Sequence, residues 1–364
     1  MSLADRHAQA LELTAAAGAP ALLCADPANV HWLTGLACEI ETGPSPFAPG
    51  PLALLAPGEP VRLIVSEDER PATLPDGVEA LAYEGFTTGP LDGPRHARRL
   101  VGEALDGRRV IAGDSAAARG FALDGDAPRE VRDVTGGLLD ARAVKDALAL
   151  AELRTALAAA DAGQAALRAA ARDADGAAEI ELFAAVRGAI EASAGTRVPL
   201  LADLVSGPRT AGIGGAPGDR VVRDGELILC DLAPRVGGSW GDSCATVVVG
   251  DGPPPAAAQR AHARVHDALR RAIEAVRPGV AVRELDRVAR DGLDYPHHSG
   301  HGIGSSYHER PRLVPSATGS LREGMVIALE PASYADAFGV RLEHVVRVTA
   351  DGCEVLSRHR LELS

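Results

Sequence analysis

The sequence predicts a smaller N-terminal α/β domain followed by a larger α+β domain. The chain has 364 residues, and one domain typically takes about 150. Strand and helix signals alternate over roughly the first 140 residues. Beyond that point the order helix, helix, strand pair occurs twice, which is typical of a pseudo-symmetric domain whose helices cover an antiparallel sheet. We therefore place the domains at residues 1–140 and 141–364.

Charge and apolar content narrow the possible partners and location. The chain carries 37 basic and 50 acidic residues, a net charge of −13, so it lacks the basic surface that nucleic acid or an anionic membrane requires. No apolar run reaches the ~18–20 residues of a membrane span, and residues 1–6 lack the pattern of a signal peptide. Five cysteines without a Cys-x-x-Cys pair indicate reduced thiols. We expect a cytoplasmic protein with no nucleic-acid and no membrane partner.

The N-terminal domain shows short apolar runs and one clear helix. Two of the runs flank Pro57-Gly58, which favours two paired strands joined by a turn. The expected elements are apolar runs at 21–24 and 29–34, strands at 52–55 and 61–65, a helix at 95–105 and a strand at 109–112.

The C-terminal domain begins with an Ala-rich helix whose leucines recur at helical spacing. A Gly/Pro-rich loop follows the first two helices, and a Gly/His-rich segment follows the second two. The expected elements are helices at 143–172 and 177–192, strands at 226–233 and 240–249, helices at 255–276 and 281–291, and strands at 325–331 and 340–349.

Each of the two strand pairs carries two carboxylates within otherwise apolar runs. A turn centred between Val236 and Gly237 would set Asp231 opposite Asp242, with their Cβ atoms ~5 Å apart. A turn centred between Asp336 and Ala337 does the same for the second pair, Glu330 and Glu343. For any single acid, an exposed turn position is the alternative. Four facing carboxylates on a buried sheet cannot all stay ionised without compensation, which indicates a cationic centre.

Histidines concentrate next to the second pair of carboxylates. Four of the 11 lie within residues 297–308, at His297, His298, His301 and His308. The Gly and Ser residues among them argue against a helix and so against a His-Glu-x-x-His zinc site. Carboxylates with imidazole suit two divalent metals of the Mn, Co, Fe or Zn type. Two such metals polarise a carbonyl and lower the pKa of water, which favours hydrolysis.

Five segments together resemble the pita-bread metallopeptidases, in the branch of Xaa-Pro aminopeptidase, prolidase and creatinase. They are Asn29–Gly35, Ala141–Asp146, Gly300–Gly304, Glu330-Pro331 and Val340–Glu343. The resemblance implies a C-terminal pita-bread catalytic domain and an N-terminal creatinase-type, ribonuclease H-like domain. It also implies a homodimer.

The resemblance assigns a role to each acid and to His301. Asp231 would bind one metal, His301 and Glu330 the other, while Asp242 and Glu343 would bridge both. The implied cofactors are two divalent ions, manganese first, with cobalt, zinc or iron as alternatives.

The resemblance also implies residues that act on the substrate. His308 would contact the substrate, His297 would line the pocket and Glu330 would move a proton. Arg341 precedes Glu343 by two residues, so on a strand both side chains share a face. Arg341 would stabilise that carboxylate or the substrate; the alternative is a structural partner of an acid.

One position departs from the family pattern. Gly214 stands where the family usually carries a histidine in the loop before the first ligand strand. Losing a donor there weakens stabilisation of a substrate carbonyl. Arg209, in the same loop, is a candidate source of charge.

These observations leave three functional hypotheses, in order of preference. The first is a metal-dependent Xaa-Pro aminopeptidase or dipeptidase, in which a hydroxide on the metals attacks the carbonyl before proline. The second is a metal-dependent hydrolase of a small non-peptide C–N bond, similar to creatinase or ectoine hydrolase, for which Gly214 is the argument. The third is a non-catalytic binding protein, against which the intact ligand set argues. The substrate would be a peptide or a small molecule.

Overall fold

The computed structural model describes residues 2–37, 49–85, 88, 92–122 and 129–364. Cys38 lies outside the described residues, and the other cysteines are free thiols. The chain divides into two compact units, Met1–Arg142 and Ala143–Ser364. No helix in the described part is long and apolar enough to cross a membrane.

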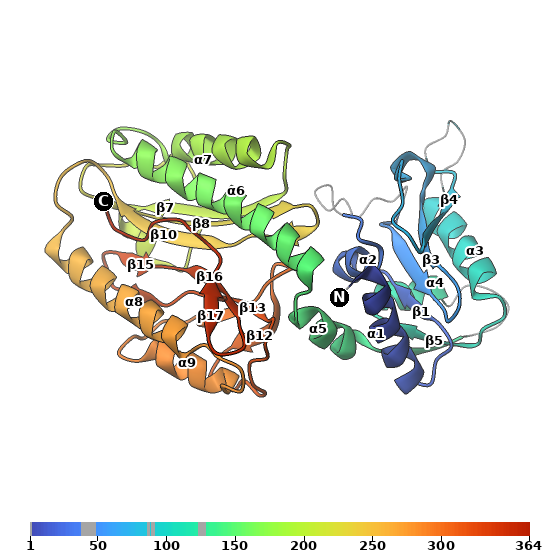
Figure 1. The fold of residues 1–364 in the computed structure, drawn as a ribbon. Helices are drawn as coiled ribbons and strands as arrows, with labels where there is room; N and C mark the ends of the chain where they lie inside the picture. Colours follow the sequence, from blue (N-terminus) through green and yellow to red (C-terminus); the bar gives the residue numbers. More distant parts are fainter. Residues whose placement is uncertain (1, 38–48, 86–87, 89–91, 123–128) are drawn as a thin grey trace. The chain divides into compact units, whose positions relative to one another are not determined.

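The first unit is built on a six-stranded sheet with the strand order β4-β3-β2-β1-β5-β6 (Figure 1). The strands are β1 (Leu22–Cys24), β2 (Leu52–Leu55), β3 (Val61–Ser66), β4 (Val78–Tyr83), β5 (Val110–Gly113) and β6 (Glu130–Asp133). The helices are α1 (Leu3–Ala16), α2 (Pro27–Thr34), α3 (Gly93–Leu105), α4 (Ala116–Ala122) and α5 (Thr135–Ala143).

Several N-terminal elements follow the sequence prediction. Strands β2 and β3 pair antiparallel, and a helix and a strand lie near residues 95–105 and 109–112, as predicted. The apolar run at 29–34 belongs to helix α2, because the Asp26 carboxylate accepts hydrogen bonds from the first turn and Pro27 favours that first turn.

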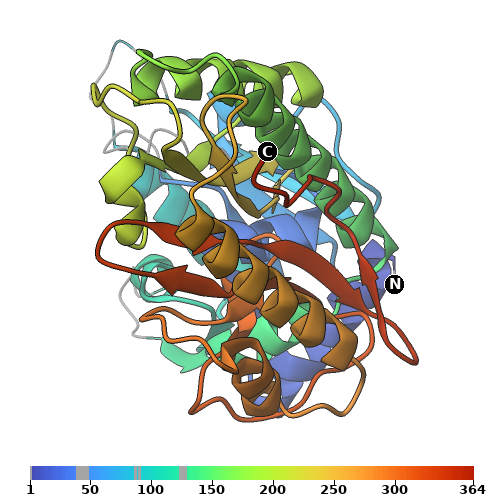
Figure 2. The ribbon, with the colours of Figure 1, turned by 90° about the vertical axis from the view of Figure 1, so that its left-hand side faces the viewer.

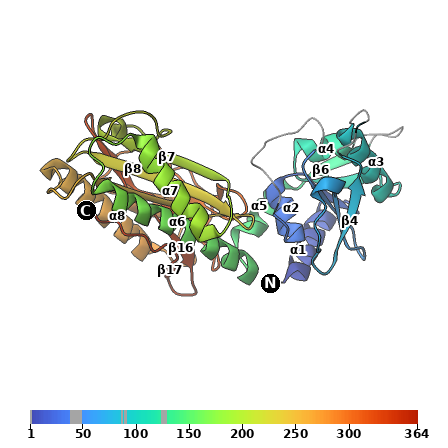
Figure 3. The same ribbon diagram turned by 90° about the horizontal axis from the view of Figure 1, so that it is seen from above.

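The first half of the second unit packs two helices on an antiparallel sheet. Helices α6 (Ala147–Ala171) and α7 (Glu179–Ala194) cover a sheet with the strand order β10-β8-β7 (Figure 3). Strand β9 also pairs with β8. The strands are β7 (Leu200–Ser206), β8 (Leu227–Val236), β9 (Ser239–Trp240) and β10 (Ser243–Val248). The predicted helices of this half are therefore confirmed.

The second half repeats this arrangement. Helices α8 (Ala256–Ala275) and α9 (Val282–Arg290) precede a five-stranded sheet with the order β12-β11-β13-β16-β17. Figure 2 shows α8 lying across the strands of this half. The strands are β11 (Gly300–Gly302), β12 (Glu309–Leu313), β13 (Val326–Leu329), β16 (His344–Val348) and β17 (Cys353–Val355), and β14 (Ala332–Tyr334) pairs with β15 (Gly339–Arg341).

Small residues let helix α6 lie very close to the sheet. Ala156, Ala159 and Ala160 are fully buried in α6. A Cβ added at Gly241, just before Asp242, would lie 2.5 Å from the carbonyl oxygen of Ala156. The backbone of α6 therefore fixes the turn that carries Asp242.

The two strand pairs differ in how well their register was predicted. In the second, Leu329 pairs with His344 and Ala332 with Arg341, so Glu330 and Glu343 face each other as predicted. In the first, Asp231 pairs with Cys244 and not with Asp242, so that prediction is wrong.

The error in the first pair comes from the position of its turn. Val236 pairs with Ser239, which places Gly237 and Gly238 in the turn, with φ of 60° and 93°. Glycine adopts these left-handed conformations without the penalty that a Cβ would add.

Candidate metal centre

Three carboxylates of the second unit converge on one point. Asp231 projects from β8, Asp242 lies between β9 and β10, and Glu343 lies between β15 and β16. One oxygen from each lies within 4.8 Å of the others. Asp242 and Glu343 are buried, and the backbone N–H of Glu343 donates to the carbonyl of Cys244 over 3.0 Å. The two halves of the unit thus meet at these acids.

Glu330 and His301 lie beside this group. Glu330 follows β13, and its backbone N–H donates to the Ser299 carbonyl over 3.0 Å. His301 Nε2 lies 3.3 Å from Asp242 Oδ2 and 3.8 Å from Glu330 Oε1. All five predicted metal ligands are therefore brought together in the structure, from β8 and the segments around β10, β11, β13 and β16.

The imidazole of His301 is oriented by the backbone. Its Nδ1 lies 2.9 Å from the carbonyl oxygen of Gly302, so Nδ1 carries the proton and donates. Nε2 therefore faces the carboxylates, and once it is deprotonated its lone pair is directed at them, which is the usual arrangement of a metal-ligating histidine.

The donor set fits divalent cations. Asp242 Oδ1 and Glu343 Oε1 are buried without a hydrogen-bond donor among the described residues, and Glu330 Oε1 contacts the His298 imidazole over 2.8 Å. A buried carboxylate oxygen without a partner is costly, and the four acids carry more negative charge than Arg341 neutralises. Cations held between these oxygens would satisfy them, so the residues present fit a metal centre.

The protein without ions must keep protons on some of these acids. Burial, with the nearby charge of Asp242, raises the pKa of Asp231 to about 8 despite Arg341. Burial also raises the pKa of Asp242 and, well above its usual value, that of Glu343. Burial opposes ionisation of Glu330 too, but contact with His298 and the charge of His301 hold its pKa at about 2. The pattern is typical of acids that share a cation.

Arg341 pairs with Asp231 and not with Glu343. Its Nη2 donates to Asp231 Oδ2 over 2.5 Å, and its side chain is 3% exposed. Its Nη1 donates to the Ile213 carbonyl over 2.6 Å and to the Tyr334 hydroxyl over 3.3 Å. Arg341 therefore holds one acid of the centre and the loop before β8 in a fixed relation.

The two predicted substrate-contact histidines lie at the edge of the centre. His297 Nε2 is 3.0 Å from the Tyr334 hydroxyl, and its Nδ1 is 3.9 Å from Glu330 Oε2. The ring of His308 lies 4.3 Å from that of His301, centroid to centroid, and His308 is exposed. Partial desolvation of its ring, together with the charges of His301 and His298, lowers the pKa of His308 to about 4.

Gly214 leaves no space for a side chain. A Cβ at this position would lie 1.8 Å from Asp203 Oδ2. Asp203 lies on β7 directly opposite Asp231 in the sheet. Arg209 points elsewhere, since its guanidinium contacts the Glu179 carboxylate and donates to the Ala216 carbonyl over 2.9 Å. Arg209 thus braces the loop and supplies no charge at the acids.

Sequence reasoning missed three contributors to the site. His298 Nε2 lies 2.8 Å from Glu330 Oε1, and the hydroxyl of Tyr334 touches both His297 and Arg341. His298 belongs to the histidine cluster at residues 297–308, and this position in the sequence could have indicated its place at the site. No pattern in the sequence pointed to Tyr334.

A third missed contributor supports the loop that holds His308. Lys145 Nζ donates to Glu309 Oε2 over 2.5 Å, and these side chains are 3% and 1% exposed. Glu309 Oε1 also accepts from the backbone N–H of Ser306 over 3.1 Å. A buried ion pair therefore fixes the residue next to His308.

Comparison with known protein families identifies the family of this chain. The profile of metallopeptidase family M24 matches residues 151–350, more than half of the chain. The chain belongs to family M24. Its fold is that of the family, because the prolidase of Pyrococcus horikoshii superposes on 99% of this chain and 100% of its own, with a TM-score of 0.82 and 25% identity. The predicted pita-bread fold with an N-terminal domain is confirmed.

Other relatives of this M24 protein agree. The Xaa-Pro dipeptidase of Pyrococcus furiosus is 36% identical over 168 residues, which are 44% of this chain and 48% of that protein. The match thus spans about half of the length of such curated relatives. An Xaa-Pro dipeptidase from Bacillus anthracis superposes on 100% of this chain and 99% of its own with a TM-score of 0.84, and at 20% identity it shows the fold alone.

Proposed function

We propose that this M24 protein is an Xaa-Pro peptidase that requires two divalent metal ions. The observation that carries the proposal is the pair of buried, unpartnered oxygens of Asp242 and Glu343, with His301 Nε2 3.3 Å from Asp242 Oδ2. Membership of a metallopeptidase family, and relatives that include Xaa-Pro dipeptidases, support the same activity. We propose manganese as the first metal to test, with cobalt, zinc and iron as alternatives.

In this proposal each site residue has one task. Asp231 would hold one ion, and His301 and Glu330 would hold the other. Asp242 and Glu343 would each contribute to holding both ions. When bound, the ions supply Lewis acidity and make water a stronger nucleophile at neutral pH. Glu330 would receive a proton from the attacking water and pass it to the leaving amine.

The histidines and Arg341 would act around the reacting group. His308 would donate a hydrogen bond to the substrate's developing oxyanion. His297, held by Tyr334, would line the same pocket. Arg341 would act as a positioning residue, because its contacts are Asp231 and the loop at Ile213. We further propose a homodimer, which light scattering of the purified protein tests.

The decisive experiment is hydrolysis by manganese-loaded protein, read by mass spectrometry. The panel holds Xaa-Pro dipeptides, Xaa-Pro-Xaa tripeptides, creatine and ectoine, with Asp242→Ala as the matched blank. Cleavage of proline peptides by the wild type alone supports the proposal, and the preferred length separates dipeptidase from aminopeptidase. Metal-loaded protein that cleaves no peptide overturns it.

A second candidate function is hydrolysis of a small non-peptide C–N bond. The contact between Gly214 and Asp203 favours it, because this contact excludes the side-chain donor expected beside a peptide carbonyl. Activity on creatine or ectoine with silence on the peptides would select this function.

A further inference from the structure

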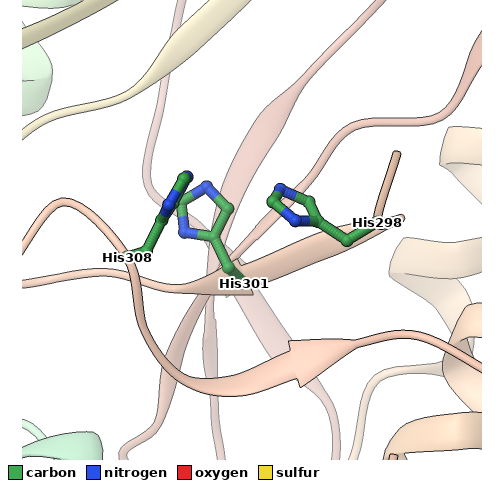
Figure 4. Close-up of side chains that lie close together, drawn as sticks. All are labelled: His298, His301 and His308. Carbon is green, nitrogen blue, oxygen red and sulfur yellow. The ribbon is translucent and has the colours of Figure 1, made fainter. Parts of the chain in front are cut away.

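A second group of imidazoles lies apart from the candidate metal centre. Figure 4 shows the group at the centre itself, which consists of His298, His301 and His308. The second group lines a pocket of about 570 Å³, whose lining among the described residues includes none of the five predicted metal ligands. This four-histidine pocket is lined by His262 and His266 from α8, His344 from β16 and His359 from the segment after β17. The proposed hydrolysis gives none of these four a task.

His359 has a buried nitrogen without a partner. Its side chain is 1% exposed, and its Nδ1 lies 3.1 Å from Oδ1 of Asp161 on α6. An ionised carboxylate only accepts hydrogen bonds, so Nδ1 carries the proton and the neutral ring keeps its lone pair on Nε2. Nε2 is buried and has no hydrogen-bond partner among the described residues. A carboxylate that holds the far nitrogen in this way is the usual support of a metal-binding histidine.

His344 lies next to His359 at the separation expected of two ligands of one ion. Their ring centroids are 4.9 Å apart. Two imidazoles bound to one zinc ion, with Zn–N bonds of about 2.0–2.1 Å, have ring centroids about 5 Å apart. Nδ1 of His344 lies 2.9 Å from Ser357 Oγ, which also accepts the backbone N–H of Val345 over 3.0 Å. Ser357 therefore occupies Nδ1 of His344, and Nε2 is the nitrogen available to a metal.

Helix α8 contributes two more imidazoles one turn apart. His262 and His266 share a helix face, and their rings are stacked with centroids 6.1 Å apart. Histidines at this spacing on one helix bind zinc in metalloproteases. Nε2 of His262 is engaged with the Leu361 carbonyl over 2.6 Å, whereas His266 is exposed. A change of side-chain rotamer is therefore required to bring His266 to the pair of His344 and His359.

The chemistry of the pocket favours a cation over an anion. Imidazole nitrogen suits Zn²⁺, Ni²⁺ and Cu²⁺, whereas Mg²⁺, Ca²⁺ and Mn²⁺ prefer oxygen ligands. Arg360 also lines the pocket and would attract an anion, but its Nε lies 3.2 Å from Glu362 Oε2, so its charge already faces a carboxylate. The unpartnered lone pair on His359 Nε2 is satisfied by a cation and not by an anion.

We propose that His266, His344 and His359 bind one divalent ion of the zinc type, at a position separate from the candidate metal centre. Three protein ligands leave the fourth tetrahedral position to water. His262 would hold α8 beside the segment after β17 through its contact with Leu361. The bound ion would join α8, β16 and that segment. The inference does not rest on the proposed function, because no member of the pocket acts on the substrate.

The test counts the zinc ions that the full chain binds. Metal-free protein is dialysed against micromolar ZnCl₂, and its zinc content is measured by mass spectrometry. The wild type should retain about one zinc ion per chain more than His359→Gln. Asp161→Asn keeps His359 but removes its charged support, and should weaken zinc binding at this position by about 10- to 100-fold. His96→Gln, on α3 in the first unit, is the matched control and should retain as much zinc as the wild type.

A second variant keeps the inference open to refutation if His359→Gln folds poorly. His266 is exposed, so His266→Gln should fold as the wild type does and still lose the same zinc ion. Asp242→Ala, which removes a ligand of the candidate metal centre, should leave that ion in place. Thermal unfolding is an independent readout, because an ion bound only by the folded chain raises Tm. The rise in Tm that zinc causes in Asp242→Ala should become smaller when His266→Gln is added.

Two outcomes overturn the inference. The first is an equal zinc content in the wild type, folded His266→Gln and folded His359→Gln, whatever their peptidase activity. The second is a loss of zinc in His96→Gln as large as in His266→Gln, because unspecific binding by histidines would then explain both losses.

Discussion

Arg341 Nη2 and Asp231 Oδ2 are 2.5 Å apart in a pair whose side chains are 3% and 14% exposed. The pair joins the two halves of the second unit, because Asp231 lies on β8 and Arg341 on β15. It also places a permanent positive charge beside acids that would otherwise repel one another. The stability of the metal-free protein should therefore depend on this pair.

At about pH 9, where Asp231 is mostly ionised, replacing Arg341 by Met should destabilise the metal-free protein by about 3–5 kcal/mol, because the buried Asp231 carboxylate would lose its cation. The loss should be smaller after metal loading, since a bound ion supplies the missing charge. Urea unfolding with EDTA and with Mn²⁺ measures both values. Arg287→Met is the control, because its pair with Glu284 is exposed and contributes little. Equal losses with and without metal would contradict this explanation.

Gly214→Ala should lower the free energy of unfolding by about 1–3 kcal/mol, because the added methyl group would collide with Asp203. Asp203→Ala in the same chain should restore most of the loss, which a double-mutant cycle measures. Gly218→Ala is the matched control, since its Cβ would meet no atom within 4 Å. If the double variant is no more stable than Gly214→Ala, the collision is not the cause.

Lys145→Met should destabilise the protein by about 3–5 kcal/mol, because it removes a buried cation that contacts the buried Glu309 carboxylate. Replacing both residues, as Lys145→Met with Glu309→Leu, should cost less than the single change. Thermal unfolding of the three proteins tests this order. A double variant less stable than the single variant would show that Glu309 stabilises the loop without Lys145.

The metal-free protein should lose stability as the pH rises from about 6 to about 8.5. The pKa of Asp231 is about 8 in the folded chain, above its usual 3.8, so the folded state binds the additional proton between these values. Burial opposes the charge on His301, but contact with Asp242 raises its pKa to about 8, so its contribution is also lost above 6.5. Both groups act in the same direction.

Calorimetry at these two pH values, with EDTA and with Mn²⁺, measures the effect. The increase in Tm on adding metal should be larger at the higher pH, because ions bind the deprotonated ligands. Asp231→Asn cannot titrate and should flatten the dependence. An increase in Tm that is equal at both pH values would contradict the proton-binding argument.

The sequence predicted the second half of the site better than the first. The apolar strand runs around Glu330 and Glu343 are interrupted symmetrically, so counting residues from the turn predicted the register correctly. In the first half the turn lies at Gly237 and Gly238, one residue later than the count assumed, so Asp231 lies opposite Cys244. Adjacent glycines favour a turn there, but they do not by themselves fix its centre to one residue.

Long-range contacts also explain what the sequence left unpredicted. The approach of Asp203 to Gly214 depends on the register of β7 with β8, and β7 was not predicted. The position of His298 depends on how β11 enters the sheet between β12 and β13. The types of residue in the sequence predicted the chemistry of the centre. The contacts of Asp203 and His298 could be identified only from the assembled sheets.

The meeting of both halves at the acids has a consequence for cooperativity. Asp231 and Asp242 belong to the half with α7, whereas Glu330 and Glu343 belong to the half with α9. Ions shared by these residues would couple the local opening of the two halves. A ligand that binds only the joined halves suppresses the opening of each half. The amide hydrogen-exchange rates of α7 and α9 should therefore become equally slow when metal is bound. They should differ again when the ions are removed.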